Sequence, residues 1–134
     1  MKHVTLNRIL ALGALTGMRS MAGPATLAFA RGGAARPGMA LLAAAEMIAD
    51  KTPFVGDRID ALPLTGRAVM GALVGGLIAG QHDDNVVLGG ALGAAAALAV
   101  AHIAYYARQR LPLPSSAGGL LEDAVVVAVA SRYR

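Results

Sequence analysis

The chain is short, apolar and poor in charge: it has 134 residues, of which 56% are apolar and 15% charged, with a formal net charge of +4 and no Cys. A soluble domain carries about 25% charged residues, and disordered chains are rich in charge and poor in apolar side chains. The composition therefore excludes disorder, and the lack of Cys excludes a disulfide framework and a thiolate zinc site. We expect a single membrane domain.

The positive charges are spread along the chain, and all but Arg19 lie at or near the ends of apolar runs. Few aromatic side chains are present on which bases could stack, because the chain has three Tyr, two Phe and no Trp. This pattern is typical of the flanks of membrane-embedded segments. It excludes nucleic acid and indicates the lipid bilayer as partner.

The first apolar run, residues 9–30, is long enough for the roughly 20 residues that cross the bilayer core. Arg19 and the Gly23-Pro24 pair lie inside it and predict a kink or break near its middle. A second segment, 38–54, follows a Gly/Pro-containing loop. Residues 50–67 contain Pro53, Gly56, Pro63 and Gly66, which predict a turn-rich loop.

Three further segments follow at 62–80, 86–107 and 117–131. The second, third and fifth segments have clean apolar parts of about 13 residues or fewer, which cover about 20 Å at 1.5 Å per residue. They approach a full span only when polar flanks are included. We therefore predict an all-α integral membrane helical bundle with about five embedded segments.

The distribution of Lys and Arg predicts the orientation of this bundle. With five crossings, the side that holds the N-terminus carries more of these residues than the opposite side, which favours a cytoplasmic N-terminus in the cell (inner) membrane. A long run, a Pro-containing linker and a shorter run with a carboxylate occur twice. This similarity favours a weak inverted repeat, and a chance likeness between Ala/Leu-rich stretches is the alternative.

Glycines recur four residues apart in the third and fourth segments. Small residues at this spacing let helix backbones approach closely in a membrane. We therefore predict glycine-mediated helix packing and a homo-oligomer. The glycines concerned are Gly71, Gly75, Gly76, Gly80, Gly89 and Gly93.

Ionisable residues inside or beside apolar runs form the candidate polar site. A charge at the bilayer centre costs from about 2.5 to more than 10 kcal/mol, so it is retained when it pairs or lines a wet cavity. Either these residues form a path for an ion or small polar solute, or they only lock helices together. The residues are Arg19, Glu46, Asp50, Lys51, Glu122 and Asp123.

The loop carboxylates Asp57 and Asp60, with Asp50, are a second candidate site. Several Asp residues can bind a hard cation through oxygen, but here Lys51 and Arg58 are interleaved with them. We interpret them as helix caps and salt bridges, and as a gate or cation entrance if the protein transports a solute. We predict no metal and no cofactor.

No catalytic signature is present: the chain lacks a nucleophile elbow, a zinc-protease helix and a phosphate-binding glycine loop. An enzyme acting on lipid head groups would need the loop carboxylates to converge on a metal. The sequence therefore predicts a protein that is not an enzyme.

Several stretches resemble the bacterial multi-pass membrane proteins catalogued as domain of unknown function 4126. The resemblance covers nearly the whole chain, and its most specific part is Glu46-Met-Ile-Ala-Asp50-Lys51-x-Pro53. It implies a multi-pass membrane protein and supplies no activity; it also draws attention to Asp57 and Asp60. The other matching stretches are Gly17-Met18-Arg19-Ser20, Pro63…Gly66-Arg67 and Leu120-Leu121-Glu122-Asp123.

Two functions remain open on the sequence. The first is a small transporter or channel for an ion or small polar solute, with Arg19, Glu46, Asp50 and Glu122 as its polar site. The second is a non-catalytic membrane scaffold or assembly protein. The two functions predict different structures. A conduction site needs a cavity that holds water, whereas a structural ion pair excludes water and has its polar atoms hydrogen-bonded.

Overall fold

The computed structural model describes residues 1–18, 22–49, 61–110 and 115–133; for some helical residues, Glu46 among them, it describes the backbone alone. The described residues form helices joined by short turns, which confirms the predicted all-α class for this part of the chain. The helices are α1 (His3–Met18), α2 (Ala22–Arg31), α3 (Ala35–Ala49), α4 (Ala61–Gln81), α5 (Val86–Arg110) and α6 (Ser115–Tyr133).

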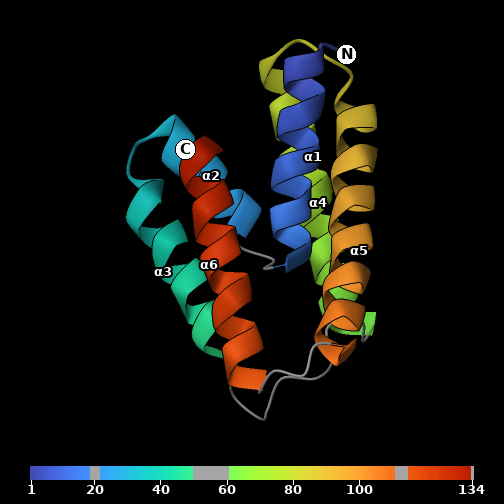
Figure 1. The fold of residues 1–134 in the computed structure, drawn as a ribbon. Helices are drawn as coiled ribbons and strands as arrows, with labels where there is room; N and C mark the ends of the chain where they lie inside the picture. Colours follow the sequence, from blue (N-terminus) through green and yellow to red (C-terminus); the bar gives the residue numbers. More distant parts are fainter. Residues whose placement is uncertain (19–21, 50–60, 111–114, 134) are drawn as a thin grey trace.

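The helices gather in two groups (Figure 1). Helices α1, α4 and α5 pack closely on one another, and α2, α3 and α6 form the second group. The hydrophobic core joins the groups, because it includes Ile9 and Leu12 of α1, Leu27 of α2, Ile78 of α4 and Val126 of α6. Helix α1 begins, and α6 ends, at the same end of the bundle (Figure 1).

The first predicted segment, 9–30, is two helices rather than one continuous span. Helix α2 packs back against α1: a methyl group built on Gly23 would lie 2.7 Å from the carbonyl oxygen of Leu12. In an uninterrupted helix these two residues would be about 16 Å apart along the axis. The predicted break is therefore present, and the chain also reverses direction across it. Gly23 permits the close approach because it has no side chain.

Helix α4 begins earlier than the predicted turn-rich loop allows. It starts at Ala61, so Pro63 lies in the first turn, where a missing N–H sacrifices no helical hydrogen bond. Gly66 and Arg67 are consequently helical residues. The prediction of a loop up to residue 67 is wrong for the residues from 61 onwards.

Two described helices are long and apolar enough to cross a membrane, Pro63–Gln81 and Val86–Arg110. The predicted bundle of five spans is not supported. Helices α1, α2 and α3 have 16, 10 and 15 residues, fewer than a perpendicular span of about 20 residues requires. Helix α6 is longer but carries Glu122, Asp123 and Arg132.

Helix α5 presents a buried stripe of small residues, Gly89, Gly93, Ala97 and Ala101, each four residues from the next. Helices α1 and α4 both pack on this stripe. A methyl group built on Gly75 of α4 would lie 3.1 Å from Gly93 Cα, and one built on Gly13 of α1 would lie 3.2 Å from the same atom. Glycines of α4 and α5 thus face one another within a single chain.

The remaining predicted glycines lie on a different side of α4. Methyl groups built on Gly76 and Gly80 would lie 3.4 and 3.6 Å from the side chain of Val86, which are ordinary van der Waals distances. These two positions are therefore less crowded than Gly71 and Gly75.

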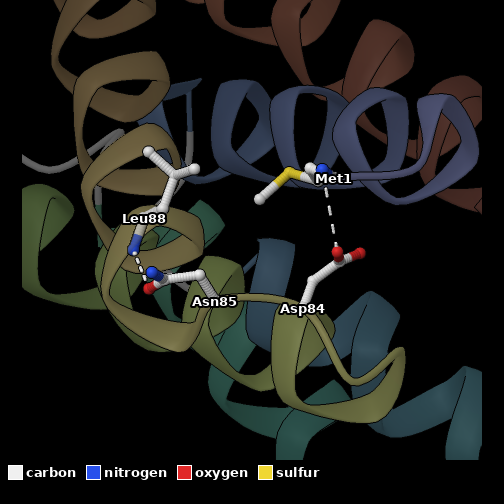
Figure 2. Close-up of polar contacts among 4 residues, drawn as sticks. All are labelled: Met1, Asp84, Asn85 and Leu88. Atoms are coloured by element: carbon white, nitrogen blue, oxygen red, sulfur yellow. Dashed lines mark hydrogen bonds and ion pairs between the residues drawn. The ribbon is translucent and has the colours of Figure 1, made fainter.

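The turn between α4 and α5 is held by its own polar groups (Figure 2). Asn85 Oδ1 accepts a hydrogen bond of 3.0 Å from the backbone N–H of Leu88 and caps the N-terminus of α5. A cap of this kind contributes about 1 kcal/mol to helix stability. The ammonium group of Met1 lies 3.9 Å from Asp84 Oδ1, so the start of α1 contacts the same turn.

Candidate functional site

Half of the residues of the predicted polar site, and both loop carboxylates, fall outside the described part of the chain. This is so for Arg19, Asp50 and Lys51, and for the loop carboxylates Asp57 and Asp60. Glu46 lies in α3, but its side chain is not described. Glu122 and Asp123 are the predicted site residues whose side chains are described, and both lie on α6.

Glu122 forms an ion pair with a residue that the sequence analysis had assigned to a loop flank. Its Oε2 atom lies 3.8 Å from Nη1 of Arg108, in the last turn of α5. The side chains of Glu122 and Arg108 are 12% and 31% exposed. The pair joins the end of α5 to α6, and the position of Arg108 at a helix C-terminus is favourable for a cation.

Arg67 is a buried charge that the sequence analysis missed. Its exposed fraction is 4%, and it lies inside the candidate membrane-crossing part of α4. It is one turn before Gly71, whose added methyl group would lie 2.8 Å from Ala97 Cβ. A prediction that the helix begins at Ala61 would have identified Arg67 as a helical residue, because this start places it inside α4 rather than in the preceding loop.

The structure has two cavities beside α4 whose described linings do not include Glu122 or Asp123. One, of about 420 Å³, is bordered by α2, α3 and α4, and another, of about 650 Å³, runs along α4 to Val86 of α5. They share Arg31, Leu73 and Leu77, and their described lining residues are apolar apart from Arg31 and Gln81.

Arg31 is positioned by the end of α2. Gly32 follows it with φ of 77° and donates its N–H to the carbonyl oxygen of Ala28 at 3.0 Å, which terminates the helix. The amide oxygen of Gln81, in the orientation that its hydrogen bonds require, accepts from Nε and Nη2 of Arg31. This contact connects the end of α2 to the end of α4.

Within the described residues, no group of three or more His, Asp and Glu side chains is arranged to hold a metal ion. Glu122 and Arg108 can form and break an ion pair, and the Arg31 guanidinium can donate hydrogen bonds to an anion. The described site therefore offers electrostatic contacts and hydrogen-bond donors.

The fold is that of an all-helical protein with two helices suited to crossing a membrane. No protein-family model, curated protein or solved structure matches the chain. The resemblance to domain of unknown function 4126 stays a prediction.

Proposed function

We propose that the protein is a non-catalytic integral membrane protein, a scaffold in which ionic contacts between helices hold the bundle together. The observation that carries this proposal is the Arg108–Glu122 pair between α5 and α6. A carboxylate that is 12% exposed and paired with a cation from a neighbouring helix fits a structural role. The membrane location also agrees with the family resemblance.

The distribution of apolar side chains supports the membrane location. Val69, Leu73 and Leu77, on one face of α4, are each about half exposed, and Val87 of α5 is 82% exposed. Similar side chains are exposed on α3 and α6. Soluble monomers rarely expose contiguous apolar surface on this scale, whereas lipid solvates it without penalty.

The predicted homo-oligomer is retained as part of this proposal, with a change of interface. The facing glycines Gly75, Gly89 and Gly93 are occupied by contacts within one chain. An oligomer would therefore associate through the exposed apolar faces instead.

Transport of an ion or small polar solute is the second candidate function. The observation that favours it is Arg67, because an ionisable residue inside a membrane span often marks a substrate path. Against it, the two described cavities have apolar linings and do not include Glu122 or Asp123. Transport is therefore the alternative that the experiment has to exclude.

Flux measurements on sealed proteoliposomes separate the two functions. We expect the parent protein to pass no ion or proton above empty vesicles, and Glu122→Gln to lower its thermal unfolding midpoint without creating flux. Gln109→Glu, a change at an exposed position in the same region, is the matched control. Flux by the parent that Glu122→Gln abolishes in a folded protein would replace the scaffold with a transporter.

Labelling of introduced cysteines tests the membrane topology. The chain has no Cys of its own, so only the introduced residue can react with the label. Helix α1 begins and α6 ends at the same end of the bundle, and α5 ends at the other (Figure 1). In sealed right-side-out vesicles we expect His3→Cys and Ser131→Cys to be protected from an impermeant maleimide and Gln109→Cys to react, which also places the N-terminus in the cytoplasm. Labelling of positions 3 and 131 from opposite sides would support the five-span arrangement instead.

A further inference from the structure

The apolar cavity bordered by α2, α3 and α4 has the dimensions of a ligand site. Its volume of about 420 Å³, and the 650 Å³ of its neighbour, fall within the range of about 300–1,000 Å³ that is usual for small-molecule sites. Leu27, Met39, Met70 and Leu73 contribute apolar walls from three helices. Methionine side chains adapt their shape to an irregular guest. We call the two adjoining cavities the α2–α4 groove.

Arg31 is the charged side chain among the described residues that line the α2–α4 groove, and it lines both parts. Gln81 accepts hydrogen bonds from its Nε and Nη2 atoms, and a guanidinium has five N–H donors, so donors remain for another group. No carboxylate of the described residues forms an ion pair with it. The groove therefore combines an apolar wall with a positive charge that none of the described carboxylates neutralises.

A second guanidinium lies beside the same turn. Arg36 Nη2 is 3.5 Å from the methyl position of Gly32, the residue that follows Arg31. Arg36 Nη2 and Nε donate to the carbonyl oxygen of Phe29 at 2.7 and 3.2 Å, and the side chain is exposed. These hydrogen bonds hold Arg36 near the end of α2, so two cations attract an anion to this end of the groove.

We infer that the α2–α4 groove binds an anionic phospholipid, with an acyl chain against Leu27, Leu73 and Leu77 and the phosphate at Arg31. The inference rests on the proposed membrane location. Arginine donates pairs of hydrogen bonds to phosphate oxygens, and basic pockets between the helices of membrane proteins hold anionic head groups. A purely apolar occupant, such as the face of a second copy, would leave the charge of Arg31 without a counter-ion.

Lipid binding to the purified full chain in detergent tests the inference. The probes are phosphatidylglycerol and phosphatidylcholine with identical acyl chains, and the readouts are bound lipid by native mass spectrometry and the thermal unfolding midpoint. We expect phosphatidylglycerol to bind about tenfold more tightly, which corresponds to about 1.4 kcal/mol, and to raise the midpoint further.

Three variants assign the effect to the groove. Arg31→Gln is expected to bring phosphatidylglycerol affinity down to that of phosphatidylcholine. Arg132→Gln is the matched control, because Arg132 is an exposed arginine in the last turn of α6 that does not line the groove, and it is expected to retain the preference. Ala28→Phe, which narrows the groove and keeps its charge, is expected to weaken the binding of both lipids.

Equal binding of the two lipids by the parent, or unchanged phosphatidylglycerol binding by Arg31→Gln, would overturn the inference. So would an equal stabilisation by inorganic phosphate, which would indicate an anion site without an acyl chain, or a lipid-free dimer that covers α4. If the parent stays in membranes after alkaline carbonate extraction, any of these results leaves the proposed location intact. Release of the parent by carbonate would instead contradict the proposed function.

Discussion

Replacing Gly75 by Leu is expected to prevent stable packing of α4 on α5. A Cβ atom at this position would lie 2.9 Å from the carbonyl carbon of Gly89 and 3.1 Å from Gly93 Cα. Both neighbours are backbone atoms, so the clash can be relieved only by separating the helices. Overpacking a core ordinarily costs about 1–3 kcal/mol, and we expect a larger loss here because Leu extends well beyond its Cβ.

Gly66→Leu is the matched control for this variant. Gly66 lies on the same helix, and a methyl group built on it meets nothing within 4 Å. Leu is a better helix former than Gly by roughly 0.5–1 kcal/mol, so this change is expected to be neutral or stabilising. Thermal unfolding and size-exclusion chromatography in detergent measure both variants. A Gly75→Leu protein with unchanged stability and a smaller oligomer would mean that the glycines act between chains.

Arg108→Met is expected to lower the free energy of unfolding by about 1–2 kcal/mol, between the values for exposed and for buried ion pairs. The change leaves the carboxylate of Glu122, which is 12% exposed, without its cation from α5. The loss is smaller than the roughly 3–5 kcal/mol for breaking a fully buried pair, because Arg108 is 31% exposed and water screens its charge. Chemical denaturation in detergent gives the value.

A double-mutant cycle with Glu122→Met separates the pair from the loss of each side chain alone. We expect the double variant to be more stable than the sum of the single changes predicts, because each single change already removes the Arg108–Glu122 attraction and the double variant loses it only once. Arg110→Met, at an exposed arginine in the same turn of α5, is expected to change stability less than Arg108→Met. Strict additivity of the two single effects would contradict the structural role of the pair.

The helices nearest to membrane spans were the most predictable elements. The predicted segments 62–80 and 86–107 correspond to α4 (Ala61–Gln81) and α5 (Val86–Arg110). Continuous apolar composition and a polar linker determine such helices locally. The extent of α4 was less clear, because Pro63 and Gly66 are typical of turns and yet are tolerated in its first two turns.

The candidate site was predictable in residue type and less so in pairing. Glu122 was recognised because a carboxylate in an apolar run is costly, but its partner Arg108 was interpreted as a membrane flank. Arg67 was missed because it was expected in the loop before α4 and because burial depends on the packing of neighbouring elements. Arg31 lies at the end of the first apolar run. Its position in a groove could not be predicted, because α2, α3 and α4 together border that groove.

Composition and local pattern were sufficient to predict helices, apolar surfaces and the absence of a disulfide or thiolate metal site, since these depend on residue type and short-range spacing. Three further features depend on contacts between residues far apart in the chain: the return of α2 along α1, the contact of Gly75 with Gly89 and Gly93, and the pairing of Arg108 with Glu122. Such contacts form only when particular helices become neighbours. Which helices do so is determined by the packing of the whole bundle rather than by the spacing within any one segment.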